Sequence, residues 1–219
     1  MKTNEELQKD VQDAIKWEPL LNAAEIGVTA KDGVVTLTGV VDCYSKKSEA
    51  ENAAKGVIGV QAVVEKIEIQ FGATWRKTDT EIATEILNAF KWTWDGSDDK
   101  VQVKVENGWV TLSGELQWNY QKESARKSAS NLLGVKGVTN NITIKSESHD
   151  QIEKEGIEKA LSRNWSIDEQ SILVKVSGNK VSLTGIVHSL FQKDEAERIA
   201  WNAPGVWSVD NELSIVYKY

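Results

Sequence analysis

The fold is decided by the stretch DGVVTLTG at residues 32–39, which returns as NGWVTLSG at 107–114 and as GNKVSLTG at 178–185. Asp-Gly and Asn-Gly are usual two-residue turns of a β-hairpin, because both central residues take a positive φ. The residues after the turn alternate between the two sides of the chain, which predicts a strand with Val35 and Leu37 on its buried face. The chain therefore contains one strand–turn–strand unit three times.

The three copies stay in register well beyond this stretch. Ala50 corresponds to Ala125 and Ala196, and the glycines at 59, 134 and 205 correspond in the same way. Such self-similarity at a fixed spacing indicates a tandem array of one structural unit. We expect domains at residues 1–70, 78–145 and 150–219, joined by two short linkers.

Each copy begins with a helical pattern, shown in the first copy by the apolar stripe of Leu7, Val11 and Ile15. The hairpin follows, then a second helix with small residues such as Ala50 on its inner face, then a last strand. The chain is therefore predicted to be α+β: three tandem αββαβ two-layer domains. Each has a three-stranded mixed sheet with two helices on one face and the other face open. Gly39 is expected to let the second helix lie close to the sheet.

This order, together with the G-x-V-x-L-x-G strand, resembles the BON domain family of bacterial osmotic-shock and nodulation proteins. The first copy carries Gly33 to Gly39, Ala50 and Gly59-Val60-Gln61-Ala62-Val63; the second carries Gly108, Val110, Leu112, Gly114, Ala125, Gly134-Val135 and Val138. The third copy departs at the turn, where Asn179 follows Gly178. The resemblance implies an envelope or periplasmic protein of the osmotic-stress response. It also implies binding to phospholipid surfaces or chaperone-like binding of other proteins.

Charge is distributed unevenly along this acidic chain, whose net charge is −7 over 219 residues. Residues 1–72 carry 8 basic and 12 acidic side chains, residues 73–146 carry 10 and 9, and residues 147–219 carry 8 and 12. An acidic protein gains little from counterion release on nucleic acid, so nucleic acid is not an expected partner. The middle copy is where an anionic ligand is expected to bind.

The single cysteine, Cys43, cannot form an intrachain disulfide, and no apolar leader follows Met1. These features favour a cytoplasmic location. A periplasmic location is the alternative if Met1 replaces a removed leader.

The sequence offers little material for catalysis. His149 and His188 have no repeated partner, and Trp118 and Ser189 stand at the positions equivalent to Cys43. No cluster of cysteine and histidine has metal-ligand spacing, and the glycines do not form a phosphate-binding pattern. We expect a protein that is not an enzyme, with no cofactor and no metal site.

Four of the nine tryptophans, Trp17, Trp92, Trp94 and Trp165, lie where the first helix of a copy ends. On a helical wheel Trp17 and Trp92 fall beside the apolar stripe. Two interpretations stay open for these residues. They close the end of the core, or they form an aromatic cluster for a partner or for lipid headgroups.

The second helix of the middle copy begins with aromatic residues and continues with basic ones. Trp118 and Tyr120 suit either a hydrophobic staple or a contact loop. Lys122, Arg126 and Lys127 suit either a solvated helix face or a patch for an acidic ligand or lipid headgroup.

Trp109 replaces Val34 and Lys180 of the other copies on the outward side of the strand, beside Thr111, Ser113 and Lys104. A tryptophan on an otherwise polar sheet face is expected to cover something. It makes a contact between repeats, or it forms part of a binding patch.

Taken together, the patterns and the resemblance predict a non-catalytic, stress-related binding protein. It would bind a phospholipid surface or a partner through exposed aromatic residues and the basic helix of the middle copy. The alternative is a chaperone-like or scaffold protein that binds other proteins and has no lipid role. The open sheet face of each unit also allows a homo-oligomer.

Overall fold

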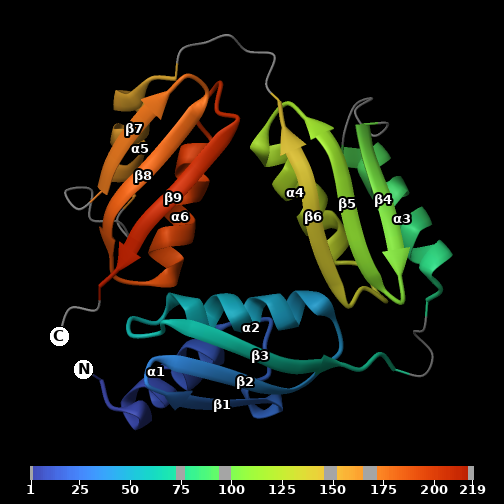
Figure 1. The fold of residues 1–219 in the computed structure, drawn as a ribbon. Coiled ribbons are helices and arrows are strands. Elements are labelled where there is room, and N and C mark those ends of the chain that lie inside the picture. Colours follow the sequence, from blue (N-terminus) through green and yellow to red (C-terminus); the bar gives the residue numbers. More distant parts are fainter. Residues whose placement is uncertain (1, 73–76, 94–99, 146–151, 165–171, 217–219) are drawn as a thin grey trace. The chain divides into compact units, whose positions relative to one another are not determined.

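The order helix–strand–strand–helix–strand occurs three times in the computed structural model (Figure 1), which describes residues 2–72, 77–93, 100–145, 152–164 and 172–216. Of Trp92 and Thr93 the backbone alone is described. We call residues 2–72 repeat 1, residues 77–145 repeat 2 and residues 152–216 repeat 3. The predicted α+β class with three tandem units is confirmed.

The elements have closely similar lengths in the three repeats. Repeat 1 contains α1 (Asn4–Trp17), a 3₁₀ turn (Ala23–Glu25), β1 (Ile26–Lys31), β2 (Val34–Val41), α2 (Tyr44–Gly56) and β3 (Ala62–Ile69). Repeat 2 contains α3 (Asp79–Thr93), β4 (Val101–Glu106), β5 (Trp109–Leu116), α4 (Asn119–Ser130) and β6 (Gly137–Ile144). Repeat 3 contains α5 (Lys154–Ser162), β7 (Ile172–Ser177), β8 (Lys180–Val187), α6 (Leu190–Trp201) and β9 (Ser208–Ile215).

Each repeat has its own three-stranded sheet, with the second strand of the hairpin at the centre. In repeats 2 and 3 the central strand pairs antiparallel with the strand before it and parallel with the last strand. The intervening helix makes this parallel pairing feasible, because parallel neighbours need a long crossover connection. The prediction of a mixed sheet is confirmed.

The hairpin turns follow the sequence closely. Asp32 and Gly33 have φ of 50° and 80°, and Asn107 and Gly108 have 53° and 82°, so both central residues are left-handed, as a type I′ turn requires. In repeat 3 only Gly178, with φ of 58°, is left-handed, because Asp32 and Asn107 are the only described non-glycine residues with positive φ. A left-handed first residue alone is the pattern of a type II′ turn. The exchange of residues at this turn therefore changes its type and keeps the hairpin.

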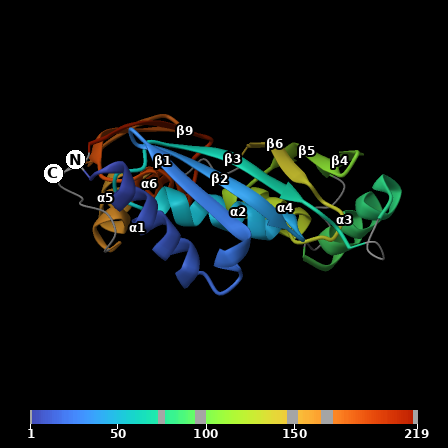
Figure 2. The same ribbon diagram turned by 90° about the horizontal axis from the view of Figure 1, so that it is seen from below.

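Both helices of a repeat pack on the same face of its sheet. In repeat 2, α3 contacts β4, α4 contacts β5 and β6, and the two helices contact each other. Figure 2 shows the strands of repeat 1 in front of α2. The core between the layers is built from apolar side chains that are 0–4% exposed; in repeat 2 these include Ile82, Ile86, Phe90, Val101, Val110, Leu112, Leu116, Ala125, Ala129, Val135 and Ile142. The other sheet face carries no helix of its own repeat.

The expected role of Gly39 is wrong. A Cβ at this position would overlap the carbonyl oxygen of Glu25, which precedes β1, and its three nearest atoms would all belong to the backbone of Glu25 and Ile26. Gly114 is placed in the same way against the carbonyl oxygen of Lys100. Both glycines have a φ near +137°, a conformation that side chains rarely adopt (139° and 135°). The glycine therefore lets the start of one strand approach its neighbour, and the helix is brought close by Ala50 and Ala54, which are fully buried.

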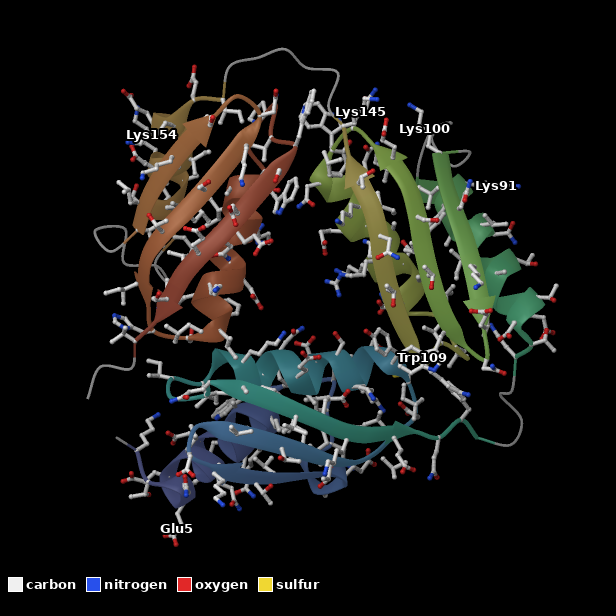
Figure 3. The ribbon with its side chains drawn as sticks, in the orientation of Figure 1. Glu5, Lys91, Lys100, Trp109, Lys145 and Lys154 are labelled. Atoms are coloured by element: carbon white, nitrogen blue, oxygen red, sulfur yellow. The ribbon has the colours of Figure 1, made fainter. Side chains whose placement is uncertain are left out.

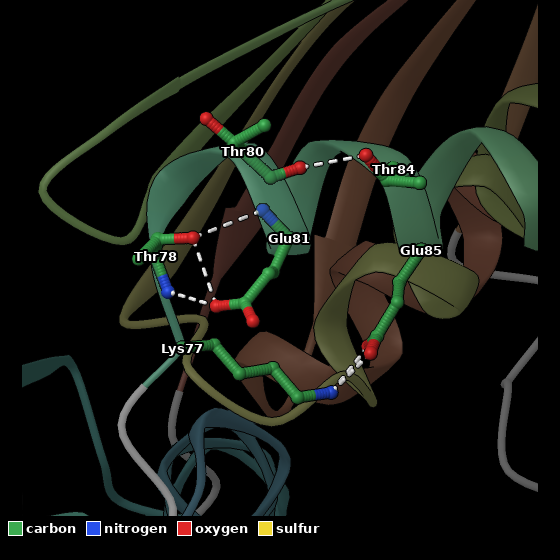
Figure 4. Close-up of polar contacts among 6 residues, drawn as sticks. All are labelled: Lys77, Thr78, Thr80, Glu81, Thr84 and Glu85. Carbon is green, nitrogen blue, oxygen red and sulfur yellow. Dashed lines mark hydrogen bonds and ion pairs between the residues drawn. The ribbon is translucent and has the colours of Figure 1, made fainter.

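The first helices of repeats 1 and 2 begin with a capping box, whereas Glu153 before α5 makes no side-chain capping bond. In repeat 1 the Thr3 N–H donates to Glu6 Oε2 (2.8 Å), and the Glu6 N–H donates to Thr3 Oγ1 (3.2 Å). In repeat 2 Thr78 and Glu81 exchange the same bonds, at 2.7 and 3.3 Å (Figure 4). The hydrogen bonds from Thr78 hold the pKa of the Glu81 carboxyl below its ordinary value. Each box satisfies N–H groups that the first turn of a helix leaves without a partner.

Candidate functional site

The start of α4 presents two aromatic side chains. Trp118 is the residue before the helix, with an extended backbone (φ −133°, ψ 140°), and its N–H donates to Gln121 Oε1 at 3.2 Å. This bond fixes the entry of the chain into the helix and leaves the indole free of a capping role. The Trp118 side chain is 37% exposed and that of Tyr120 is 63% exposed. Tyr120 is therefore available to a partner.

Basic side chains continue along the exposed part of α4. The Arg126 Nε lies 3.0 Å from Glu123 Oε2, so this guanidinium is paired within the helix. Lys122 and Lys127 form no ion pair with any residue that the structure describes. The opposite side of the helix holds Ala125 and Ala129, both fully buried against the sheet. We call Trp118, Tyr120, Lys122, Arg126 and Lys127 the α4 face.

The charge of α4 distinguishes it from the equivalent helices. It carries three basic residues and one acidic residue, whereas α2 carries three and two, and α6 carries two and three. In α2, moreover, Lys46 pairs with Asp42 at 2.7 Å and Lys55 with Glu51 at 3.0 Å. The two lysines of α4 without an ion-pair partner therefore give repeat 2 the most positive of the three second helices.

Of the four tryptophans at helix ends, only Trp17 has a side chain that the structure describes. Trp94, Trp165 and the side chain of Trp92 lie outside the described residues. Trp17, the last residue of α1, is 84% exposed. The interpretation that Trp17 closes the end of the core is therefore wrong, because its ring is in solvent while Ile15 and Val11 fill the core.

Repeat 1 exposes two further apolar side chains that the sequence patterns did not single out. Leu20, just after α1, is 53% exposed, and Ile58, just after α2, is 48% exposed. Neither belongs to a periodic stripe, and a loop position gives no signal of burial. Like Trp17, both lie close to the end of a helix, and this position is the one signal that could have marked them.

Trp109, labelled in Figure 3, begins β5 and lies on the sheet face that the helices leave uncovered. It stands opposite Gly137 of β6 in the parallel register. A Cβ at Gly137 would overlap the six-membered ring of Trp109, so the indole occupies the space that a side chain there would take. The ring covers part of its own sheet, and 56% of the residue still faces solvent.

The residues considered for catalysis make local contacts. His188 Nδ1 lies 2.7 Å from the carbonyl oxygen of Val216, and Cys43 Sγ lies 3.3 Å from Ser45 Oγ. His149 lies outside the described residues. Within the ranges that the structure covers, no group of three His, Cys, Asp or Glu residues is arranged to hold a metal ion. Nothing in these contacts prepares a nucleophile or a general base.

A groove with a volume of about 590 Å³ lies between the helices of repeat 3. It lies between α5, from Glu153 to Arg163, and the end of α6, from Ile199 to Pro204. None of the predicted site residues lines it.

Among the helices whose residues the structure describes, none is both long and apolar enough to cross a bilayer.

The structure defines the class of protein first: a tandem array of small two-layer α+β domains with exposed aromatic and basic side chains. Among the described residues no reaction centre is assembled. A family model for the BON domain matches residues 3–70, 78–146 and 149–217. These matches cover nearly the whole chain, which therefore belongs to the BON domain family.

Two curated relatives extend this finding. Osmotically-inducible protein Y of Escherichia coli (strain K12) is 32% identical over 138 residues, which cover 57% of this chain and 64% of the relative. The 21 kDa hemolysin of Actinobacillus pleuropneumoniae is 31% identical over 134 residues, covering 60% of this chain and 65% of the relative. The chain thus spans slightly less than two thirds of the length of each.

Among solved structures, CdsD, a structural protein of the type III secretion system of Chlamydia trachomatis, aligns over 95% of this chain and 91% of its own with a TM-score of 0.25 and 16% identity. Its C-terminal domain aligns over 98% of this chain and 100% of its own, with a TM-score of 0.26 and 16% identity. At these scores the likeness carries no argument about fold or function.

Proposed function

We propose that this BON-family chain is a non-catalytic, stress-related binding protein whose repeat 2 attaches to an anionic phospholipid surface through the α4 face. The observation that carries the proposal is that Tyr120, 63% exposed, shares one helix with Lys122 and Lys127, which pair with no acidic residue that the structure describes. The name of the Escherichia coli relative, an osmotically inducible protein, supports a role under osmotic stress.

The physical basis is the usual one for a helix that lies on a membrane. Basic residues next to an anionic leaflet contribute about 1 kcal/mol each, and an interfacial aromatic ring adds a contact at the headgroup level. The flanking repeats are acidic, and the whole chain carries −7, so attraction is confined to repeat 2. Attachment is therefore weak and is screened by salt, because the Debye length falls to about 10 Å at 0.1 M.

The test is co-sedimentation with vesicles of phosphatidylglycerol and phosphatidylcholine at low and high salt. We expect the protein to sediment with the anionic vesicles at low salt and to be released at high salt. The Lys122→Glu plus Lys127→Glu variant should lose the binding, and Tyr120→Ala should weaken it.

A matched control is Lys154→Glu plus Lys175→Glu in repeat 3, which changes the net charge by the same amount and leaves the α4 face intact. This control should sediment as the wild type does. Absence of binding to anionic vesicles at low salt, or equal loss in both double variants, would refute the proposed attachment.

A second candidate function has its own observation. Trp17, Leu20 and Ile58 expose 84%, 53% and 48% of their surface in repeat 1, and exposed apolar side chains suit chaperone-like or scaffold binding of other proteins. Suppression of the aggregation of reduced insulin would measure it. Under this candidate Trp17→Ala lowers the suppression, while Lys122→Glu plus Lys127→Glu leaves it unchanged. The reverse result would show that Trp17, Leu20 and Ile58 do not form the protein-binding surface.

A further inference from the structure

The uncovered sheet face of repeat 2 is a grid of polar side chains with one aromatic ring. The strand register places residues in rows across the sheet: Glu106, Trp109 and Gly137, then Lys104, Thr111 and Thr139, then Gln102, Ser113 and Asn141. We call these rows the β5 face. It lies on the side of the sheet opposite α4, so it is separate from the α4 face.

The aromatic ring of this face lies over the neighbouring strand β6. Gly137, where the other repeats have Ala62 and Ser208, leaves room for the six-membered ring of Trp109 against the backbone of β6. One side of the ring therefore lies against the sheet before any ligand arrives. Its 56% exposure leaves a surface that a ligand can cover.

The polar side chains of β5 and β6 on this face are uncharged between Thr111 and Asn141, and the charged Lys104 and Glu106 of β4 pair with each other. Thr111, Ser113, Thr139 and Asn141 form no side-chain hydrogen bond with any described residue, so their donors and acceptors face solvent. Hydroxyl and amide groups both donate and accept hydrogen bonds. This face therefore offers a ligand both kinds of partner at closely spaced positions.

The charges on the β5 face are neutralised locally. Lys104 Nζ lies 2.9 Å from Glu106 Oε2, and at the far end of the sheet Lys145 Nζ lies 3.4 Å from Glu115 Oε1. By contrast, the same face of repeat 3 exposes Leu173 (50%) beside charged strand residues. A neutral grid attracts neither an anionic headgroup nor a charged peptide.

We propose that the β5 face binds a neutral carbohydrate chain, with one sugar ring against Trp109 and its hydroxyl groups on the neighbouring threonine, serine and asparagine side chains. A pyranose ring presents polarised C–H bonds that suit the negative face of an aromatic ring, and its hydroxyl groups donate and accept as these side chains do. A lipid tail would leave the surrounding polar groups unpaired, and an anion would find no net positive charge.

The experiment is affinity gel electrophoresis of the full chain through four neutral polysaccharides, namely hydroxyethyl cellulose, dextran, laminarin and glycol chitin, with alginate as an anionic comparison. We expect at least one neutral polysaccharide to retard the protein, with a dissociation constant that is insensitive to salt. Trp109→Val, which places the repeat 1 residue at this position, should weaken the binding about tenfold or more, and Trp109→Phe should restore part of it.

Two variants make the comparison specific. Trp207→Val, at another exposed tryptophan, and Lys122→Glu plus Lys127→Glu, on the α4 face, should both bind as the wild type does. Circular dichroism confirms that each variant is folded. The inference is overturned if no neutral polysaccharide retards the wild type, if Trp109→Val and Trp207→Val behave alike, or if retardation disappears at high salt. Failure to bind vesicles would refute the lipid attachment of the α4 face and would not affect the carbohydrate binding proposed for the β5 face. The two proposals can therefore be refuted independently.

Discussion

At the scale of single residues, glycines decide where the chain can approach itself. Gly39 has a φ of 139°, and its hydrogen points at the carbonyl oxygen of Glu25, where a methyl group would overlap backbone. Backbone cannot move aside as a flexible side chain can, and the left-handed conformation adds its own cost for any other residue. Gly56, at the end of α2, has nothing within 4 Å of the position that a Cβ would take.

The two glycines give a matched pair of substitutions within repeat 1. Gly39→Ala should lower the local free energy of unfolding by about 2 kcal/mol or more, because overlap and backbone strain act together. Gly56→Ala should leave it unchanged or raise it by about 0.5 kcal/mol, because alanine favours the helix. Amide hydrogen exchange in β1 and β2 measures both. Equal effects would show that the contact with Glu25 is not the reason for the glycine.

At the scale of elements, one asparagine on β6 and one on β9 tie these last strands to the second helices of their repeats. Asn140 Nδ2 donates to the Lys122 carbonyl oxygen at 2.9 Å, and Asn140 Oδ1 accepts from the Ile142 N–H at 3.3 Å. Asn211 makes the same two bonds in repeat 3, to Lys193 and Leu213. Each β6 and β9 strand is a sheet edge, so the asparagine also covers a backbone donor that would otherwise be open to another strand.

Asn140→Ala tests this link. It should destabilise repeat 2 by about 1–2 kcal/mol, because the hydrogen bond to α4 is lost and the Ile142 N–H loses its partner. Asn141→Ala is the control. The Asn141 side chain is exposed and makes no hydrogen bond with a described residue, so its removal should change stability by less than about 0.5 kcal/mol. Urea denaturation followed by hydrogen exchange in β6 gives both values. A similar loss in the two variants would contradict the assigned role.

The helices of repeat 3 are joined by a carboxylate. Glu195 of α6 accepts from Arg198 at 2.6 and 2.7 Å and from Asn164, just past α5, at 2.8 Å. The hydrogen bond from Arg198, opposed by burial and aided by its charge and by Asn164, holds the pKa of Glu195 below its ordinary 4.5. A lowered pKa in the folded state means that the ionised carboxylate stabilises the fold above pH 4.5, and that this contribution is lost as the pH falls through the folded value.

Glu195→Gln should therefore lower the melting temperature of the protein at pH 7. The difference from the wild type should shrink as the pH falls below about 4.5, where the wild-type carboxylate becomes protonated as well. Thermal unfolding followed by circular dichroism between pH 3 and 7 measures the difference. A difference that stays constant over this range would show that the charge of Glu195 does not contribute.

The elements were predictable because their signals are local. The hairpin turns, the alternation around Val35 and the stripe of Leu7, Val11 and Ile15 each lie within a few residues, and the structure confirms them. The role of Gly39 was not predictable, since its neighbour Glu25 lies across a strand pair. The links from Asn140 to α4 depend in the same way on tertiary packing.

The candidate site was predictable only in part. The α4 face could be read from the sequence because its residues share one helix, and the structure shows which of its cations are paired. The exposure of Trp17 could not be predicted from the sequence. A residue beside an apolar stripe can pack over the end of the core or point into solvent, and which of the two occurs depends on where the helix ends. The room made by Gly137 for Trp109 likewise became visible only with the strand register.

At the scale of the whole molecule, the same architecture carries three different surfaces. The sheet faces display Val34, Val40 and Val64 in repeat 1, a neutral polar grid in repeat 2, and Leu173 and Ile186 among charged residues in repeat 3. In repeat 3 the buried core cluster consists of residues of that repeat alone, so its outward positions could change without changing this core. Duplication has thus kept the two-layer frame constant while the outward positions differ.

The central claim is that each copy is an autonomous αββαβ unit. The most direct test is the ¹H–¹⁵N NMR spectrum of a fragment comprising residues 78–146, recorded beside that of the full chain. The account predicts dispersed amide signals whose positions for β5 and the buried side of α4 match those in the full chain. A narrow, unfolded spectrum for the fragment would contradict it, because repeat 2 would then need its neighbours to complete its core.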